Sequence, residues 1–351
     1  MAICSIHNVR MAGLAAAVPP VRKVEWQELE IPTERFKRAR SFNRMPSVRA
    51  ARWEQCQSDF CERAAKQLLD ELGWAPASVD VIVMVTMTPD YPIPATGIIM
   101  QDRLGLPKAC VAFDLPGGGV TLLHGIQVVA SMLSSGCLRR GLLLFGEVSK
   151  VVEGPDSIEN FEHICGHNGG ALAFEHSPGG KPMSFSTGGD GTLESAYQMP
   201  VGGTRRPPRP EMFATKCDQT FNNTAAQFKL DTRVCNEAAL RELPSSARAA
   251  LAEAGKRVED IDHCFLQPMD IATEDALRTE LGFRKDRFHG FAYEYGAGGS
   301  GGIPLSMLSR AASQLQSGPR ISLLTGIGAG LAWASAVIHT DGMVCPDLIE
   351  M

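Results

Sequence analysis

The sequence repeats itself at a fixed spacing, and this repeat constrains the fold more than any other feature. Residues 64–85 and residues 247–268 follow one plan, in which a helical pattern ends at a glycine and, after six further residues, an aspartate opens an apolar run. The two aspartates, Asp80 and Asp262, are 182 residues apart. Such self-similarity indicates that one structural unit has been used twice.

A second pair of segments has the same spacing. The segment "ASMLSSGCLRRGLLLFG" (130–146) matches "ASQLQSGPRISLLTGIG" (312–328), and Ser131 and Ser313 are again 182 residues apart. Both segments contain a helical pattern, a glycine stop and an apolar strand in the same order. Two independent anchors at one offset predict an internal duplication.

Strand and helix patterns alternate in both halves. The strands are apolar runs without polar alternation, which is typical of strands buried on both faces, so we expect an α/β fold with helices covering the sheets. The longest apolar run, 323–338, is too short and too rich in glycine for a membrane-spanning helix and predicts buried strands joined by a turn. We predict an N-terminal half at 1–176, a connecting or capping region rich in Gly, Pro, Ser and Arg at 177–225, and a C-terminal half at 226–351.

A tight glycine turn stands at the same place in each half. In "AFDLPGGGVTLLHGI" (112–126) an apolar strand leads into Gly117, Gly118 and Gly119 before a helix, and "GAGGSGG" (296–302) opens the equivalent helix. We call these two turns the first and second elbow. The N-terminus of a helix suits an anion, a thiolate or an oxyanion, because its N–H groups are unpaired and carry partial positive charge. Yet the three glycines of the first elbow offer no side chain that can react.

Charge and cysteine content exclude several classes of function. A formal net charge of −5 and a pI near 5.9 argue against nucleic acid as a partner, because phosphate binding needs an excess of Lys and Arg. The 10 cysteines are scattered, without a C-x-x-C pair or a Cys/His cluster at zinc spacing. We therefore expect free thiols in a cytoplasmic protein that has neither a metal site nor a membrane partner.

Several segments, in their order and spacing, resemble the β-ketoacyl-acyl-carrier-protein synthase III family of the thiolase superfamily. The segments are "VIVMVTMTPDYPIPATGIIMQDRLGLPKACVAFDL", "ASMLSSGCLRRGLLLFGE", "CGHNGGALAFE", "EDIDHCFLQP" and "LLTGIGAGLAWASAVI", and together they run over nearly the whole length of the chain. The resemblance implies an internally duplicated thiolase-like fold with α/β/α/β/α layers.

The resemblance also places the family's catalytic residues. The family uses a cysteine at the first elbow to take an acyl group from a thioester, and a histidine and an asparagine to support decarboxylation of a malonyl partner. The cysteine position falls on Gly119, the histidine on Gln267, with Pro268 as the alternative placement, and the asparagine on Ala297. Glycine cannot attack a thioester, and glutamine can donate a hydrogen bond but cannot exchange a proton near neutral pH. We therefore expect all three catalytic functions to be lost.

Other side chains near these positions are weaker catalytic candidates. His167 and Asn168 stand where the family has Asp and Gly, so His167 is either a relocated acid/base or a polar turn residue paired with backbone, and we favour the turn residue. Cys165 is either a substitute nucleophile or, as we favour, a buried inert thiol. Glu294 and Tyr295 either line a pocket or hydrogen-bond the second elbow.

A basic segment is the candidate for binding the substrate. Residues 35–52 carry seven basic residues and no acidic ones, and the sequence position resembles the place where the family holds coenzyme A or the acidic carrier protein. Arg44, Arg49 and Arg52 are the candidate phosphate ligands, and the alternative is a solvated loop. Glycines near the C-terminus would let the backbone pass close to a thioester arm: Gly326, Gly328 and Gly330. No cofactor is expected; the implied substrate is an acyl group on coenzyme A or on phosphopantetheine.

The sequence supports three hypotheses about function. The leading one is a catalytically degenerate subunit that pairs with an active homologue in a condensing or acyl-transfer enzyme of lipid, polyketide or other specialised biosynthesis. The rivals are a stand-alone acyltransferase that works without an acyl-cysteine, by proximity of two substrates, and an acyl-thioester binding module. In the family the strand before the first elbow pairs across a two-fold axis. Here that strand is "ACVAFDL", with Cys110 expected in the core, and we expect a heterodimer or a homodimer.

Overall fold

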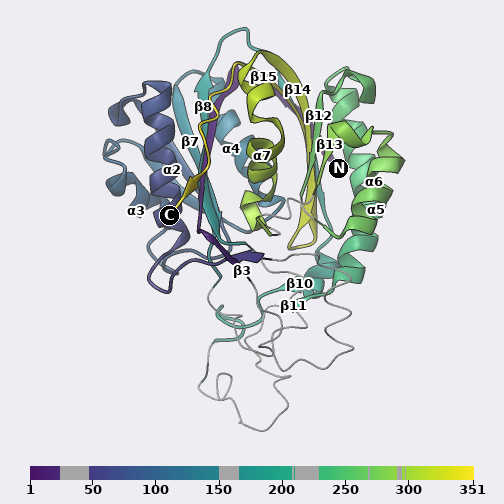
Figure 1. The fold of residues 1–351 in the computed structure, drawn as a ribbon, viewed down its shortest axis with the longest axis horizontal. Helices are drawn as coiled ribbons and strands as arrows, with labels where there is room; N and C mark the ends of the chain where they lie inside the picture. Colours follow the sequence, from purple (N-terminus) through teal and green to yellow (C-terminus); the bar gives the residue numbers. More distant parts are fainter. Residues whose placement is uncertain are drawn as a thin grey trace.

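Two mixed sheets and three layers of helices form the described part of the chain (Figure 1). The computed structural model describes residues 1–23, 47–149, 166–207, 209, 229–267, 269–290, 295–296 and 298–351. Two short antiparallel ribbons lie beside the sheets: β3 (Val21–Lys23) with β4 (Ser47–Arg49), and β10 (Tyr197–Gln198) with β11 (Lys229–Leu230).

The first sheet has the order β16-β2-β8-β7-β5-β6. Its strands are β16 (Ile349–Glu350), β2 (Val9–Val18), β8 (Asn168–His176), β7 (Arg140–Glu147), β5 (Val81–Thr86) and β6 (Val111–Pro116). β5 is parallel to both β6 and β7, whereas β8 is antiparallel to β7 and β2. Every residue of β5 is buried, as the uninterrupted apolar run predicts.

The second sheet has the order β1-β9-β15-β14-β12-β13 and repeats the strand directions of the first, except that β1 is antiparallel to β9 whereas β16 is parallel to β2. Its strands are β1 (Ala2–Ile6), β9 (Met183–Gly189), β15 (Ala332–Asp341), β14 (Pro319–Gly328), β12 (His263–Leu266) and β13 (Phe288–His289). β12 is parallel to β13 and β14, and β15 is antiparallel to β14 and β9. The apolar run 323–338 forms the buried parts of β14 and β15, as predicted.

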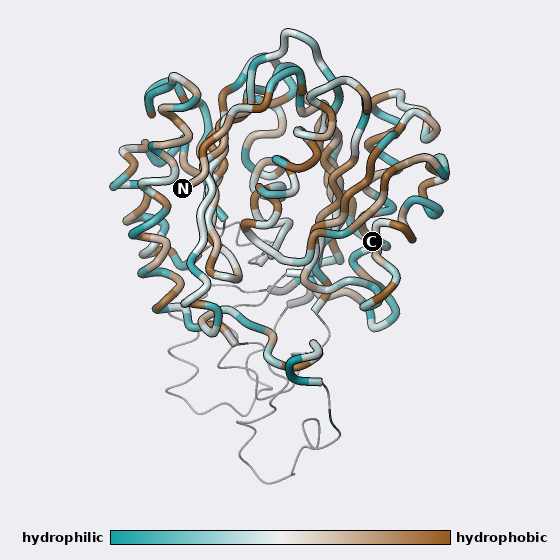
Figure 2. Tube along the Cα trace, turned by 180° about the vertical axis from the view of Figure 1, so that it is seen from behind, coloured by the Kyte–Doolittle hydropathy of each residue, from teal (hydrophilic) through white to brown (hydrophobic). Residues whose placement is uncertain are grey.

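Helices cover the outer faces of both sheets and fill the space between them (Figure 1). The outer pairs are α2 (Gln57–Leu72) with α3 (Thr96–Arg103), and α5 (Thr232–Glu253) with α6 (Ile271–Leu281). The central pair is α4 (Thr121–Ser134) with α7 (Gly302–Gln316). In Figure 2 the strands are largely brown and the outer helices carry many teal segments, as expected of amphipathic helices with one face in solvent. The predicted α/β/α/β/α layering is confirmed.

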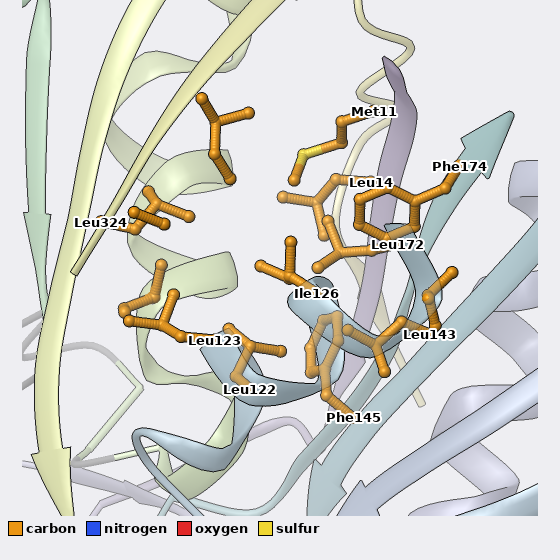
Figure 3. Close-up of a cluster of buried hydrophobic side chains, with 14 of the residues drawn as sticks. Met11, Leu14, Leu122, Leu123, Ile126, Leu143, Phe145, Leu172, Phe174 and Leu324 are labelled. Carbon is orange, nitrogen blue, oxygen red and sulfur yellow. The ribbon is translucent and has the colours of Figure 1, made fainter. Parts of the chain in front are cut away.

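The largest core cluster lies around the two central helices. Side chains of α4 pack between the two sheets, with the first sheet on one side and Leu324 of β14 on the other (Figure 3). The labelled members of this cluster are Met11, Leu14, Leu122, Leu123, Ile126, Leu143, Phe145, Leu172, Phe174 and Leu324. Burial of these side chains holds the two halves together, since apolar area removed from water contributes about 25 cal/mol per Å².

The two aspartates that revealed the repeat have one structural role. The Asp80 carboxylate accepts hydrogen bonds from the Arg139 and Arg140 amides at the start of β7, at 2.7 and 3.1 Å. The Asp262 carboxylate accepts a hydrogen bond from the Ile321 amide in β14, at 2.8 Å. Each aspartate thus ties a helix–strand turn to the neighbouring parallel strand, which explains why it opens an apolar run in each half.

The boundary between the halves differs from the sequence-based division. Residues 183–189, assigned above to the connecting region, form β9 and take the place in the second sheet that β2 has in the first. The segment MSFSTGG is rich in small residues, so composition alone made it look like a linker. The two terminal strands also change places, because β1 joins the second sheet through β9 and β16 joins the first through β2.

Candidate functional site

The first elbow joins β6 to α4. Gly117 and Gly119 have φ angles of 145° and 58°, which are costly for any residue with a side chain. The Gly117 amide donates to the carbonyl of Thr86 at the end of β5, at 3.0 Å. A Cβ on Gly118 would lie 2.6 Å from the terminal methyl of Met87, so this methionine packs directly on the elbow. The chain therefore makes a tight turn whose backbone conformation favours glycine, held by the loop after β5.

The structure brings Gly119 and Gln267 together. A Cβ on Gly119 would lie 3.6 Å from the amide carbon and nitrogen of Gln267 and 3.2 Å from the Ile327 carbonyl oxygen. Gln267 is 7% exposed, and its Nε2 donates to the Gly299 carbonyl oxygen at 2.9 Å. Pro268, the alternative placement, lies outside the described residues. Gln267 therefore links the first elbow to the second.

The second elbow is also held by the buried side-chain amide of Asn168. Gly298 and Gly299 have φ angles of 66° and 52°. The Nδ2 of Asn168, at the start of β8, donates to the carbonyl oxygens of Gly298 and Gly166, at 3.0 and 2.8 Å. Asn168 thus positions backbone. Ala297, the predicted counterpart of the family's asparagine, lies outside the described residues.

Sequence reasoning missed Glu147, the last residue of β7. This carboxylate is 1% exposed and accepts hydrogen bonds from Thr86, Met87, Thr88 and Ser300. Burial raises the pKa of Glu147 to about 7, although the hydrogen bonds oppose the shift. The available signal was the acid that ends the apolar run "LLLFGE", since an ionisable residue that closes a buried strand needs a partner or a function.

Two of the three C-terminal glycines lie against the elbows. A Cβ on Gly326 would lie 2.6 Å from Cβ of Gln267, and one on Gly328 would lie 2.9 Å from the Gly118 carbonyl oxygen. Side chains at these positions would close the space between β14 and the first elbow. Gly330 is different: it lies in the turn from β14 to β15, and the three atoms nearest to a Cβ placed there, its chain neighbours aside, belong to Ala332.

His167 has both ring nitrogens engaged with backbone. Nδ1 accepts a hydrogen bond from the Ala51 amide at 2.8 Å, so Nε2 carries the proton and donates to the Ser149 carbonyl oxygen at 3.1 Å. The ring thereby ties the segment after β4 to the end of β7. Cys165 and Glu294, the other weak catalytic candidates, lie outside the described residues.

Arg49 is a buried arginine that forms an ion pair with the exposed carboxylate of Glu350. Its guanidinium donates to the Pro19 carbonyl oxygen and to the Glu350 carboxylate, both at 2.7 Å, and it lies 5.1 Å from the centroid of the Tyr295 ring. Arg49 is 8% exposed, whereas Arg52 is exposed. Of the three predicted phosphate ligands, Arg52 is the one whose side chain faces solvent among the described residues; Arg44 lies outside them.

Other chemistry finds little support among the described residues. Cys110 packs in the core cluster on the outer side of the first sheet, and burial raises the pKa of its thiol to about 11. In the described ranges, no group of three or more His, Cys, Asp or Glu residues is placed to hold a metal ion. Likewise, the helices of the described part are too short or too polar to cross a bilayer.

The two elbows therefore form one site with hydrogen-bonding groups at its centre. The atoms nearest to a Cβ placed on Gly119 belong to the Gln267 amide and the Ile327 carbonyl, whereas the first N–H groups of α4 are already bonded to the carbonyl oxygens of Gly118, Gly119 and Val120. The Gln267 amide can orient an acyl group by hydrogen bonds. It cannot form a covalent bond to that group.

Known proteins resemble this chain in sequence and in structure. The model of the 3-oxoacyl-[acyl-carrier-protein (ACP)] synthase III C-terminal family matches residues 251–340. A β-ketoacyl-[acyl-carrier-protein] synthase III from Roseiflexus castenholzii is 30% identical over 279 residues, which cover 79% of this chain and 81% of the relative. The enzyme of the same name from Desulfitobacterium hafniense is 28% identical over 283 residues, 80% of this chain and 82% of its own.

A solved structure extends the likeness to the fold. The crystal structure of a 3-oxoacyl-(acyl-carrier protein) synthase from Burkholderia xenovorans LB400 matches with a TM-score of 0.91 at 23% identity, covering 100% of this chain and 99% of that one. The duplicated sheets and the paired elbows described above thus occur in a chain that resembles synthase III relatives over four-fifths of its length. The chain belongs to the β-ketoacyl-[acyl-carrier-protein] synthase III family and has its thiolase-like condensing-enzyme fold.

Proposed function

We propose that this chain is a catalytically degenerate member of its family that serves as the non-catalytic subunit beside an active homologue. The observation that carries the proposal is Gly119, which stands at the first elbow with Gln267 as its neighbour. Without a thiol at position 119 the chain cannot hold an acyl group covalently there, and a carboxamide cannot act as an acid or base. The elbow itself is intact, which favours a retained structural role over random decay.

The exposed edge of the first sheet supports a partner of the same fold. β6 is the edge strand, and Val111 at its start is 40% exposed. The Asp114 carboxylate on β6 accepts hydrogen bonds from the Thr96 and Gly97 amides, which anchors the start of α3 beside this edge. Large apolar side chains of this region are exposed: Tyr91 at 58%, Ile93 at 85% and Ile98 at 46%. An open strand flanked by apolar surface is unfavourable on a monomer and suits a second chain that adds its own strand.

The proposed assembly binds an acyl thioester of coenzyme A or of a carrier protein in the active partner. This chain contributes by stabilising the partner's fold or by shaping its acyl pocket. Arg52, exposed beside the start of α2, is the described residue we assign to the phosphate of the thioester carrier.

Co-expression tests the proposal. The chain is co-expressed with an active synthase III homologue from the same genome, and the purified material is analysed by size-exclusion chromatography with light scattering. We expect a heterodimer whose condensation turnover exceeds that of the partner alone. If only homodimers form and the partner's turnover is unchanged by this chain, the stand-alone acyltransferase becomes the better hypothesis. If the isolated chain binds acyl thioesters and no turnover accompanies either form, the binding module is favoured.

A further inference from the structure

A buried acid lies between the two elbows and contacts the segments that hold both. Glu147 is 1% exposed at the end of β7, and the proposed function makes no use of it. A carboxyl group so deeply buried is costly unless its protons and lone pairs are all matched. The two carboxylate oxygens of Glu147 contact different segments of the chain.

One carboxylate oxygen of Glu147 holds the loop after β5. Oε2 accepts hydrogen bonds from the Met87 amide at 2.9 Å, the Thr88 hydroxyl at 3.1 Å and the Thr86 hydroxyl at 3.2 Å. The same loop contacts the first elbow twice, through the Thr86 carbonyl that accepts the Gly117 amide and through Met87 packed on Gly118. Glu147 thus supports the first elbow through this loop.

The other carboxylate oxygen holds the second elbow. Oε1 lies 3.0 Å from the Ser300 hydroxyl and 3.5 Å from the Ser300 amide. A Cβ on Gly299 would lie 2.3 Å from Cγ of Glu147, so the glycine is what lets the carboxyl approach. Glu147 therefore connects the first elbow to the second from one side, as Gln267 does from the other.

The contacts of Ser300 provide a place for a proton on this carboxyl. The Ser300 hydroxyl oxygen accepts a hydrogen bond from the Gly146 amide at 3.0 Å and lies 3.3 Å from the Val85 carbonyl oxygen. If Glu147 is neutral, its O–H donates to the Ser300 oxygen and Ser300 donates onward to Val85, so every proton has an acceptor. The threonine hydroxyls keep donating to Oε2, because the Thr86 and Thr88 oxygens already accept the Thr88 and Val148 amides. The network thus accommodates a neutral acid without a broken hydrogen bond.

The charged groups around Glu147 give its ionised form little support. The five donors that reach the carboxylate are uncharged hydroxyls and amides. On α2 the facing titratable group is the Cys61 thiol, which both Glu147 and Asp90 affect by Coulomb repulsion. Arg103 on α3 is paired with Asp59 and Glu62, and no cation of the described residues is among the causes that shift the pKa of Glu147.

β8 is the strand paired with β7 at Glu147. It places the neutral Asn168 opposite Glu147, and the ring of His167 beside it is bound to backbone. Burial consequently raises the pKa of Glu147 to about 7.

We propose that Glu147 is a positioning residue that holds the two elbows together as a neutral acid and lets them separate when it ionises. The inference goes beyond the proposed function and concerns the isolated chain. In the form in which the elbows are held together, burial raises the pKa of the carboxyl. The stability that this group contributes is fully present below its unfolded pKa and is lost as the pH rises through its folded pKa. Openings that hydrate Glu147 therefore become easier between pH 6 and pH 8.

Hydrogen exchange of the isolated chain tests this inference. After correction for intrinsic exchange, with the amides of β14 and β15 as internal reference, opening of residues 86–88 and 298–301 should increase about tenfold between pH 6 and pH 8. Glu147→Gln mimics the neutral acid, since its Nε2 can donate to Ser300 while its oxygen accepts from the loop. This variant should keep the pH 6 protection at both pH values. Asp90→Asn removes a neighbouring carboxyl, and this control should retain the wild-type pH dependence.

Two outcomes would overturn the inference. The first is a wild-type chain whose elbow protection follows the reference amides at all pH values. The second is a Glu147→Gln variant that keeps the wild-type pH dependence. If Glu147→Gln does not fold, infrared spectroscopy of the wild-type chain replaces it as the test. We expect the band of a protonated carboxylic acid at pH 6 and its loss by pH 8. Absence of the band at pH 6 would contradict a neutral Glu147. None of these measurements involves a partner or a thioester, so they are independent of the proposed function.

Discussion

The backbone conformation of Gly119 and the space around it decide whether a side chain can be placed at the first elbow. Its φ of 58° lies in the left-handed region, and the space where a side chain would begin is bounded by the Ile327 carbonyl at 3.2 Å. A small side chain fits there after a slight shift, but at the cost of backbone strain. A cysteine at this elbow is therefore sterically possible, and its described neighbours would be the Gln267 amide and the Ile327 carbonyl.

Gly119→Cys should fold and yet fail as a catalyst. We expect it to lower the free energy of unfolding by about 1–2 kcal/mol, because residues with a Cβ pay for the left-handed conformation. We expect no condensation product from the isolated chain, since Gln267 cannot exchange the proton that decarboxylation requires. Urea denaturation and a product assay by mass spectrometry measure the two effects, and Gly119→Ala supplies the same strain without the thiol. Condensation by Gly119→Cys alone would contradict the proposed degeneracy, because it would show that the site needs only a nucleophile.

Two neighbouring arginines should respond differently to truncation. Arg49→Ala removes a buried guanidinium that bridges Pro19 and Glu350, so we expect the free energy of unfolding to fall by about 2 kcal/mol. Arg52→Ala removes an exposed charge, so we expect a change within about 0.5 kcal/mol. Binding of coenzyme A should weaken in Arg52→Ala, and wild-type affinity should fall with added salt. Denaturation measures the two stability changes, and calorimetric titration measures the affinity for coenzyme A. If this affinity is unaltered in Arg52→Ala and insensitive to salt, the basic segment is a solvated loop and does not bind the phosphate.

At the scale of elements, edge strands set how this chain associates. β6 ends the first sheet and β1 ends the second, so each is an edge with unpaired backbone groups. Both carry an exposed apolar residue, Val111 at 40% and Ile3 at 49%. The apolar loop before α3 accompanies only β6, which is why we place the partner there.

Val111→Lys should therefore disrupt assembly without affecting the fold. The side chain is exposed in the isolated chain, so the thermal midpoint of the monomer should stay unchanged, whereas a buried lysine at the subunit interface would be unfavourable. Light scattering should show loss of the dimer in Val111→Lys and its retention in the matched control Ile3→Lys. A dimer that survives Val111→Lys but not Ile3→Lys would move the interface to the second sheet.

The sequence predicted most elements for identifiable reasons. Apolar runs without alternation marked the buried strands, and glycines with positive φ, such as Gly136 and Gly318, ended α4 and α7 as expected. β9 was missed because its small residues pack closely against β15 and resemble a linker in composition. Glu147 was missed for another reason: its partners come from β5 and the second elbow, and contacts at such separations leave no local pattern.

At the scale of the whole molecule, the duplication carried the prediction of the fold. Because a constant offset of 182 residues relates the two halves, an element predicted in one half could be checked against the other. The two sheets indeed follow one plan. The candidate site was predictable only in part. Gly119 and Gln267 were predicted through the family resemblance, and the structure places the Gln267 amide 3.6 Å from where a Cβ on Gly119 would lie, whereas Ala297, Cys165, Glu294 and Arg44 lie outside the described residues.

The exchange of terminal strands has a consequence for how the molecule is made. Residues 344–351 run along β2, with Val344 bonded to Ala12 and Leu14 and Met351 bonded to Val18, and Arg49 is paired with Glu350. A nascent chain emerging from the ribosome therefore exposes the outer edge of β2 until residue 350 has been translated. The first sheet is therefore completed only after residue 350 has emerged, although its other strands emerge earlier. Until then the open edge is a site for chaperones or for mispairing with another nascent chain.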